Sequence, residues 1–353
     1  MHYLFVFGTR PEAIKLLPLA ITLRKRGERV TLLSTSQHTD LLVGVLEAFG
    51  LSSDITLPPP PKERSLDMLV RFFVAYLPRY IREISPDAVV VQGDTVSAFC
   101  GAFTAFLLDV HVIHIEAGLR TYQRKTPYPE EALRRMITPL ATVHFATTEK
   151  AREHLLAEGV REHVYTVGNT VTDAMRFFCP QPKRRNPPYA LVTTHRREND
   201  GEVREGIFRA ISRLANTHSD LAFFVVLNEN KSIQSMAYRM LSERENIELL
   251  LPRPLKDFYS LLSGASLVLT DSGGVSEEGA VLGLSTFVLR DTTEREWEWE
   301  NGKITLVGTD EEGIFRKVSS FIKKGIPTEK GSVGMPEGSV SEQIVEILQR
   351  ITL

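Results

Sequence analysis

The chain has 353 residues, of which 42% are hydrophobic and 24% are charged, and its formal net charge is −2. This length predicts two domains of about 150–200 residues, and the near-neutral charge gives no indication of a nucleic-acid or membrane partner. Apolar runs such as residues 88–91 are far shorter than the roughly 20 residues of a membrane span, and the first residues predict a strand rather than a signal peptide, so we expect a cytoplasmic protein.

Apolar runs typical of buried parallel strands alternate with helix-length segments along the whole chain. In the first half we predict strands at residues 3–7, 30–34, 88–91, 112–115 and 143–146, with helices at 12–26, 65–84 and 130–139. A second series of strands follows at residues 189–194, 222–227, 247–251, 267–270, 286–289 and 304–307. This alternation predicts an α/β protein with two doubly wound, Rossmann-like domains facing a central cleft.

The two series are separated by a proline-rich, basic segment that cannot extend a helix. We therefore predict an N-terminal domain at 1–178, a linker at 179–188 and a C-terminal domain at 189–338, followed by a terminal segment at 339–353. The two cysteines, Cys100 and Cys179, are far apart in the sequence and form neither a disulfide framework nor a zinc pattern. We expect two buried thiols and no metal site.

Polar clusters follow five of the predicted strands, as expected for ligand sites at the carboxyl ends of doubly wound sheets. They lie at residues 8–13, 92–95, 116–120, 194–199 and 271–274. Asp94, Glu116 and Glu130 bring carboxylates to the first domain, where neighbouring acids can divide into proton donor and base. Each alone could equally be a helix cap or a loop hydrogen-bonder, but jointly they favour acid/base chemistry at carbon.

The stretch at 267–283 predicts a nucleotide-sugar site in the second domain. Two glycines, Gly273 and Gly274, stand where a strand turns into a helix, so backbone N–H groups can face a pyrophosphate. A carboxylate one turn later, Glu277 or Glu278, can accept from ribose hydroxyls. The alternative is an ordinary turn in which Asp271 or Ser272 caps the helix and the glutamates are solvated.

Several cations and one histidine lie in the same clusters. Arg10 and Lys15 could hold a phosphate or substrate hydroxyls, or could simply cover the first helix. Arg120, Arg196 and Arg197 could hold phosphates or form interdomain salt bridges, and the polar sequence after His195 argues against a core histidine.

Eight motifs in this order resemble the non-hydrolysing UDP-N-acetylglucosamine 2-epimerases. They are GTRPEAIK at 8–15, QGDT at 92–95, HIEAGLRT at 114–121, PEE at 129–131, GNTVTDA at 168–174, THRREN at 194–199, TDSGGVSEE at 270–278 and RDTTER at 290–295. The resemblance implies a glycosyltransferase-B-like architecture in which the C-terminal helix packs back on the N-terminal domain. It also implies a UDP-sugar substrate, a homodimer and no cofactor.

The implied reaction converts UDP-N-acetylglucosamine reversibly to UDP-N-acetylmannosamine by elimination and re-addition of UDP through a glycal. By the same resemblance, Asp94, Glu116 and Glu130 match acid/base positions and His195 matches a histidine at the departing pyrophosphate. The binding positions are Arg10, Ser272, Gly273 and Gly274 for phosphate, Glu278 for ribose, and Lys15 as an active-site lysine.

The chain departs from the family pattern in three places, one of which is the stretch at 293–299, where the family usually has a proline after the arginine. Gln37, Arg64 and Arg196 match an allosteric UDP-N-acetylglucosamine site, but the family's Val-His-x-Asn histidine is missing from residues 224–230, which leaves the need for an activator open. Arg124 and Lys125 precede the PEE motif, so the same mechanism on a modified sugar such as UDP-2,3-diacetamido-2,3-dideoxy-glucuronate is an alternative. A glycosyltransferase or a nucleotide-sugar-binding regulator would be an alternative of another class.

Overall fold

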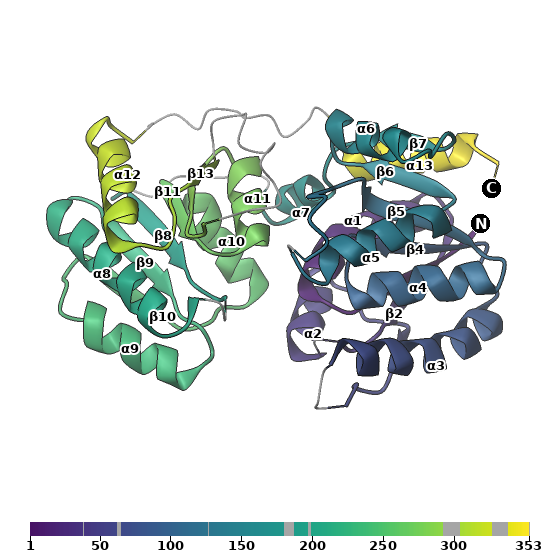
Figure 1. Ribbon diagram of the computed structural model, residues 1–353, viewed down its shortest axis with the longest axis horizontal. Helices are drawn as coiled ribbons and strands as arrows, with labels where there is room; N and C mark the ends of the chain where they lie inside the picture. The colour runs from purple at the N-terminus through teal and green to yellow at the C-terminus, as the bar shows by residue number, and fades with distance from the viewer. Residues whose placement is uncertain are drawn as a thin grey trace. The chain divides into compact units, whose positions relative to one another are not determined.

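The chain folds into two compact units, formed by Met1–Ala174 with Pro336–Leu353 and by Met175–Met335 (Figure 1). The computed structural model describes residues 1–37, 39–61, 65–125, 127–179, 187–196, 199–291, 304–326 and 338–352. Each unit is built on a parallel sheet between helices, which confirms the predicted α/β class with two doubly wound halves.

The first unit contains a seven-stranded parallel sheet in the order β3-β2-β1-β4-β5-β6-β7. Its strands are β1 (His2–Phe7), β2 (Arg29–Ser34), β3 (Ile55–Thr56), β4 (Ala88–Gln92), β5 (His111–Ala117), β6 (Val143–Ala146) and β7 (Val164–Thr166). The residues of β1 and β4 are buried throughout, as expected for central strands covered on both faces. Two short strands at the sheet edges, β3 and β7, were not predicted.

Helices cover both faces of this sheet (Figure 1). They are α1 (Arg10–Lys25), α2 (Thr39–Ala48), α3 (Leu66–Ile84), α4 (Val96–Leu107), α5 (Glu130–Ile137), α6 (Glu149–Ala157) and α13 (Val340–Arg350), with a 3₁₀ turn at Thr138–Leu140. A further helix, α7 (Val171–Phe178), begins in this unit and ends in the second. One core joins β1, β2 and β4 to α3, α4 and α5. The C-terminal helix α13 packs against α1, and the backbone N–H of Ser341 donates to Asp173 of α7 at 2.7 Å.

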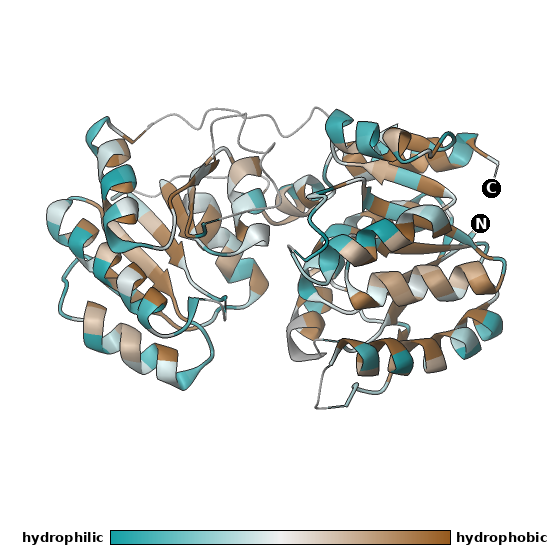
Figure 2. Cartoon of the chain, viewed as in Figure 1, coloured by the Kyte–Doolittle hydropathy of each residue, from teal (hydrophilic) through white to brown (hydrophobic). Residues whose placement is uncertain are grey.

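The second unit contains a six-stranded parallel sheet in the order β10-β9-β8-β11-β12-β13. Its strands are β8 (Tyr189–Thr193), β9 (Ala222–Val226), β10 (Ile247–Leu250), β11 (Leu267–Thr270), β12 (Ser285–Val288) and β13 (Ile304–Leu306). Its helices are α8 (Glu202–Thr217), α9 (Lys231–Leu241), α10 (Leu255–Gly264), α11 (Gly273–Val281) and α12 (Glu311–Lys323). The strands are largely apolar and the outer helix faces are polar (Figure 2).

The strand order reverses once in each sheet, between β1 and β4 and between β8 and β11. Successive crossovers leave in opposite directions from such a point, and doubly wound sheets bind ligands there, outside the carboxyl ends of the strands. We therefore expect the ligand-binding residues in the loops after β1, β4, β8 and β11.

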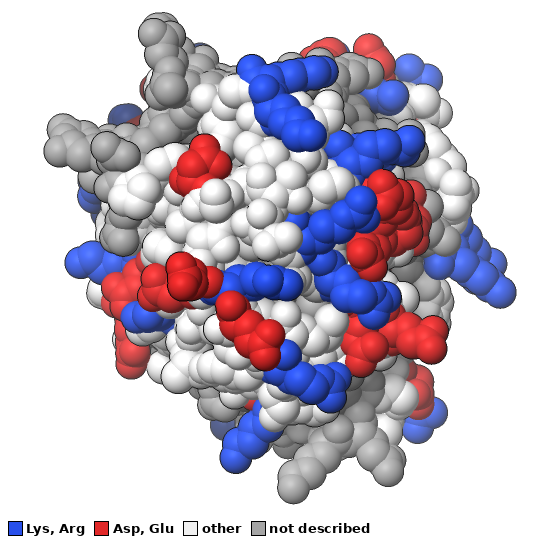
Figure 3. Space-filling view, turned by 90° about the vertical axis from the view of Figure 1, so that its left-hand side faces the viewer, with Lys and Arg blue, Asp and Glu red and all other residues white. Residues whose placement is uncertain are grey.

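The outer face formed by α8, α9 and α12 carries interspersed charges of both signs (Figure 3). Arg209 pairs with Glu311 at 2.9 Å and Arg213 with Glu312 at 2.6 Å, which joins α8 to α12. Both cysteines are buried free thiols, as predicted. Among the described residues, every helix is too short or too polar to cross a bilayer.

Candidate active site

The loop between β1 and α1 is organised by Glu12, a fully buried carboxylate. Its Oε2 accepts from the backbone N–H groups of Gly8 (3.1 Å) and Thr9 (2.8 Å) and from the Thr9 hydroxyl (2.7 Å). Its Oε1 accepts from the hydroxyl of Thr95, the N-cap of α4, at 2.6 Å. Burial raises the pKa of Glu12 to about 7, and these hydrogen bonds oppose that rise only in part.

Sequence reasoning missed Glu12, although a signal for it was present. Thr9 and Glu12 have the Ser/Thr-x-x-Glu spacing of a capping box, in which the acidic side chain accepts from the N-cap backbone.

Lys15 and Glu116 form a buried ion pair that joins α1 to the end of β5. Each side chain is 6% exposed, so Lys15 does not cover a solvated helix face. Glu116 has a φ of +63°, and the register between β5 and β6 shifts between Ile115 and Ala117. An irregularity of this kind re-aims a side chain, and non-glycine residues with positive φ cluster at functional sites.

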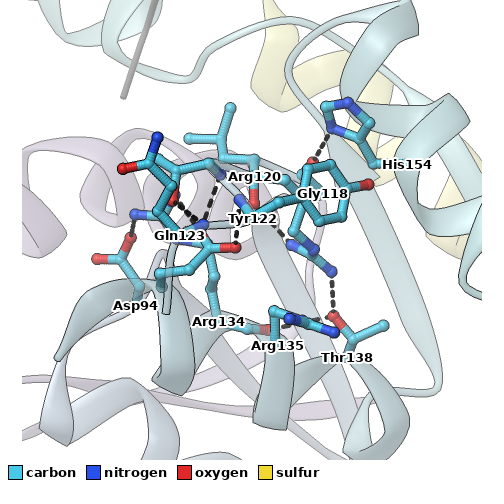
Figure 4. Close-up of polar contacts among 12 residues, drawn as sticks. Asp94, Gly118, Arg120, Tyr122, Gln123, Arg134, Arg135, Thr138 and His154 are labelled. Atoms are coloured by element: carbon cyan, nitrogen blue, oxygen red, sulfur yellow. Dashed lines mark hydrogen bonds and ion pairs between the residues drawn. The ribbon is translucent and has the colours of Figure 1, made fainter. Parts of the chain in front are cut away.

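Asp94 follows β4 and is paired with Arg134 of α5 (Figure 4). Its Oδ2 lies 2.5 Å from Arg134 Nη2, and Arg134 Nη1 lies 3.5 Å from Glu131. Glu131 is buried and accepts from the backbone N–H groups of Thr121 and Tyr122, both at 3.1 Å. Glu130 is the half-buried first residue of α5, one turn before Arg134, so the same helix that pairs with Asp94 also carries Glu130.

Arg120 is committed to contacts within its own unit, some of which Figure 4 shows. Its Nε and Nη2 donate to the carboxylate of Glu158 at 2.8 and 2.7 Å, Nη2 also donates to Thr138 and Nη1 donates to the Leu119 carbonyl. These contacts lower the pKa of Glu158. The salt bridge that Arg120 forms lies within the first unit and is therefore not the interdomain one that was predicted.

Gln37 lies beside the β1–α1 loop in a small polar cluster. Its Oε1 accepts from Ser97 at 2.8 Å, and Ser97 hydrogen-bonds to Thr35 at 2.7 Å. A Cβ on Gly8 would stand 2.1 Å from Thr35 Oγ1 and 2.3 Å from Ser97 Oγ, so the backbone of Gly8 is packed directly on this cluster. Arg64, the second allosteric candidate, lies outside the described residues, as does Arg197.

In the second unit, Asp271 holds the loop that carries His195. The carboxylate of Asp271 is fully buried and accepts from the backbone N–H of His195 at 2.8 Å and that of Arg196 at 3.1 Å. It also accepts from Asn199 Nδ2 at 2.9 Å. The side chain of His195 is exposed, while its backbone is fixed.

Arg204 of α8, whose side chain is fully buried, also contacts this loop. Its Nη1 donates to the Thr194 carbonyl at 3.0 Å and its Nη2 to the Arg196 carbonyl at 2.6 Å. Sequence reasoning missed Arg204, because a charged residue in an amphipathic helix gives no sign of being buried.

Gly273 and Gly274 are the first residues of α11, directly after β11. Ser272 is the N-cap, and its side chain accepts from the Val275 N–H at 3.4 Å, so of the two predicted capping residues it is Ser272. Glu277 and Glu278 are both buried, which shows that their interpretation as solvated glutamates was wrong. Glu278 Oε1 accepts from the Tyr259 hydroxyl at 2.8 Å, which fixes its carboxylate.

The structure thus brings Arg10, Lys15, Asp94, Glu116 and Glu130 to the carboxyl end of the first sheet. A separate set lies at the carboxyl end of the second sheet, formed by His195, Arg196, Ser272, Gly273, Gly274 and Glu278.

Comparison with known proteins gives one consistent result. The family model for UDP-N-acetylglucosamine 2-epimerase matches residues 21–349. A putative UDP-N-acetylglucosamine 2-epimerase of Thermotoga maritima is 37% identical, with 99% of this chain and 96% of that protein covered. The UDP-N-acetylglucosamine 2-epimerase of Bacillus subtilis is 35% identical, with 97% and 93% covered.

Solved structures agree with the sequence comparison. The UDP-GlcNAc 2-epimerase of Neisseria meningitidis, bound to UDP-GlcNAc, superposes with a TM-score of 0.90 at 34% identity and covers 99% of this chain and 100% of that one. Acinetobacter baumannii MurG superposes with a TM-score of 0.60 at 13% identity, a likeness of fold alone that agrees with the glycosyltransferase-B-like architecture. Matching from near the start to near the end of the chain, in sequence and in fold, places this protein in the UDP-N-acetylglucosamine 2-epimerase family, as the eight motifs predicted.

Proposed function

We propose that this protein is a non-hydrolysing epimerase that interconverts UDP-N-acetylglucosamine and UDP-N-acetylmannosamine through a glycal. The proposal depends on one observation in a protein of this family. Two fixed carboxylates lie at the carboxyl ends of two neighbouring strands. Asp94 follows β4 and Glu116 lies near the end of β5, and each is fixed by a cation from another element, Arg134 and Lys15. Acids held in fixed positions at the carboxyl end of one sheet suit proton transfer, because the acid or base must first lie within reach of the proton.

The proposed reaction breaks and re-forms two bonds. A carboxylate removes the proton at sugar carbon 2 while the bond from carbon 1 to the UDP oxygen breaks, and the electron pair of the C–H bond forms the double bond of the glycal. The UDP oxygen then adds back to carbon 1, and an acid protonates carbon 2 from the opposite face. Asp94, Glu116 and Glu130 are the proposed acid/base set.

The second unit supplies the proposed hold on UDP. Ser272, Gly273 and Gly274 offer the N-terminus of α11 to the pyrophosphate, because its backbone N–H groups and dipole favour an anion. Glu278, oriented by Tyr259, is the proposed ribose acceptor. His195 is proposed to face the departing pyrophosphate, and Arg10 is a further proposed phosphate contact. A firm hold on released UDP is what allows re-addition in place of hydrolysis.

Incubation with UDP-N-acetylglucosamine in deuterated water tests the proposal. Proton NMR should show deuterium entering at sugar carbon 2 and UDP-N-acetylmannosamine forming, without acceptor or added NAD. Release of free UDP and N-acetylmannosamine would instead indicate a hydrolysing enzyme. Exchange restricted to UDP-2,3-diacetamido-2,3-dideoxy-glucuronate would assign the modified-sugar alternative.

Asp94→Asn tests the assignment of the acid/base group. It should lower turnover by about 10²–10⁴-fold while calorimetry shows nearly unchanged UDP affinity, because the proposed UDP contacts lie elsewhere. The control is Asp310→Asn, in the exposed cap of α12, which should leave both quantities unchanged. Full turnover in Asp94→Asn would contradict the role given to Asp94.

Regulation and assembly follow from the same proposal. Gln37 and Arg196 are proposed to contact an activating UDP-N-acetylglucosamine, so Gln37→Ala should flatten a sigmoidal dependence of rate on substrate if an activator is used. The protein is proposed to be a cytoplasmic homodimer, and sedimentation velocity measures its oligomeric state directly.

A further inference from the structure

The three-residue loop Gly93–Asp94–Thr95 is anchored on both sides of Asp94 by buried titratable side chains. On one side, His114 Nε2 lies 2.8 Å from the Gly93 carbonyl oxygen. On the other, the Thr95 hydroxyl donates to Glu12 Oε1 at 2.6 Å. Both Glu12 and His114 are fully buried, and the contact of His114 with Gly93 is buried as well.

These contacts come from the two elements on either side of the loop, a helix and a strand. Glu12 lies in the helix after β1, and His114 lies in β5. Glu12 cannot rotate away from Thr95 without losing the donors from Gly8 and Thr9 on its other oxygen. These contacts therefore connect the loop to α1 on one side and to β5 on the other.

The direction of the His114 contact follows from its partner. A carbonyl oxygen only accepts, so the Nε2 of His114 must carry the proton. Burial lowers the pKa of His114 to about 4, which keeps the ring neutral and fixes this tautomer near pH 7. Gly93 itself has a φ of +67°. Glycine adopts positive and negative φ about equally readily, so its backbone alone would not hold this conformation. The flanking contacts remove that freedom.

We propose that Glu12 and His114 are positioning residues for Asp94, which act through Thr95 and Gly93 to fix the backbone that aims its carboxylate. The inference rests on the proposed acid/base role of Asp94. Arg134 fixes the carboxylate end of the same side chain, so Asp94 is held at three points. Displacement of a reacting group by about 1 Å can cost about 10²-fold in rate, which gives such contacts a kinetic effect far larger than their binding effect.

The first test compares Thr95→Val with Thr95→Ser. Valine removes the hydroxyl that donates to Glu12, and serine keeps it. Thr95→Val should lower kcat by about 10–100-fold with KM and UDP affinity changed less than about threefold, and Thr95→Ser should recover most of the loss. Thr95 also caps α4 by accepting from the Ala98 N–H. The matched control is therefore Thr148→Val, which removes the equivalent cap of α6 without touching the loop, and should leave kcat unchanged.

The second test addresses His114. His114→Leu removes the donor to Gly93 and should lower kcat by about 10-fold or more, and His114→Gln, which restores an N–H donor, should recover part of it. The control is His144→Leu, because His144 is buried on the neighbouring strand in register with His114. The Ala141 backbone, and not the Gly93–Thr95 loop, is the group that opposes the lowering of the His144 pKa by burial.

A third variant separates positioning from proton transfer by Glu12 itself. In Glu12→Gln the amide oxygen can take the donors from Gly8 and Thr9, and the amide N–H can donate to the Thr95 hydroxyl. Turnover should stay within about fivefold of the wild type, since a positioning contact is kept. A loss as large as that of Asp94→Asn would overturn the positioning role and make Glu12 a proton-transfer group.

The outcomes separate the inference from the function on which it rests. A wild type without exchange at carbon 2 on any UDP-sugar tested refutes the proposed function. An active wild type with inactive Asp94→Asn, but full turnover in both Thr95→Val and His114→Leu, overturns the inference alone. Circular-dichroism melting accompanies each variant. If Thr95→Val does not fold, the decision passes to His114→Leu against His144→Leu and to Glu12→Gln, which keep the α4 cap.

Discussion

Replacing Glu12 by glutamine should change how the stability of the first unit depends on pH. The unfolded carboxyl has a pKa near 4.5, whereas burial raises the folded value to about 7. Between these values the folded state keeps a proton that the unfolded state has lost, so wild-type stability is complete below pH 4.5 and falls as pH rises to about 7. The separation of about 2.5 in pKa, at about 1.4 kcal/mol each, is worth about 3 kcal/mol.

Glutamine mimics the protonated acid at every pH, so Glu12→Gln does not carry this dependence. The stability of the variant minus that of the wild type should therefore increase by about 3 kcal/mol between pH 4.5 and pH 8. The difference cancels all other titrations, which the two proteins share.

Urea unfolding read by pulsed hydrogen exchange and mass spectrometry measures this difference in peptides of β1, α1 and β4. A control variant, Glu83→Gln, removes an exposed carboxylate of α3 paired with Arg79 and should change the stability by less than about 1 kcal/mol, because exposed ion pairs contribute little. A flat difference for Glu12→Gln, or a difference that falls as pH rises, would refute the reasoning that burial dominates the titration of Glu12.

Three further changes should alter stability by amounts that the contacts set. Lys15→Ala leaves Glu116 buried without this cation and should cost about 3–5 kcal/mol of unfolding free energy in urea titration, with much of the loss recovered in the double variant with Glu116→Gln; a double variant no better than Lys15→Ala would contradict this. Asp271→Ala removes the acceptor of three donors, so it should lower the unfolding free energy by about 2–4 kcal/mol and weaken UDP binding in calorimetry. Its control, Asp310→Ala, removes an exposed helix cap and should lower the unfolding free energy by about 1 kcal/mol while UDP affinity stays intact. Gly8→Ala forces a Cβ against two hydroxyls and should cost about 1–3 kcal/mol, and a melting temperature equal to that of the wild type would show that this packing is loose.

The elements that sequence predicted best are the central strands and the helices that cover them. Strands such as β1 and β4 are buried on both faces, so they appear in the sequence as short, mostly apolar runs. The edge strands β3 and β7 have two and three residues, too few to carry a period. Their strand conformation follows from pairing with β2 and β6, which the local sequence does not encode.

The candidate site divides in the same way. Asp94 and Glu116 were found because polar residues after buried strands must lie at the carboxyl edge of a parallel sheet. Their partners Arg134 and Lys15 were not assigned to them, since Lys15 and Glu116 are 101 residues apart and only the strand order brings them together. Asp271 and Arg204 were missed as loop anchors for a related reason. Their burial depends on three-dimensional packing, and a charged residue is ordinarily taken as exposed.

Buried charge alone does not mark the site. The pair of Arg120 with Glu158 has an arginine side chain with no exposure, and it joins the 3₁₀ turn at Thr138–Leu140, α6 and the loop after β5, away from the point where the strand order reverses. The pairs Lys15–Glu116 and Arg134–Asp94 are also buried on the side of the cation, but they fix acids directly after β4 and near the end of β5, at and beside that reversal. Burying an ion pair is often no better for stability than packing apolar side chains, so the fold gains little from these pairs. What they provide is a defined direction for two carboxylates, and that is the property a proton transfer at carbon requires.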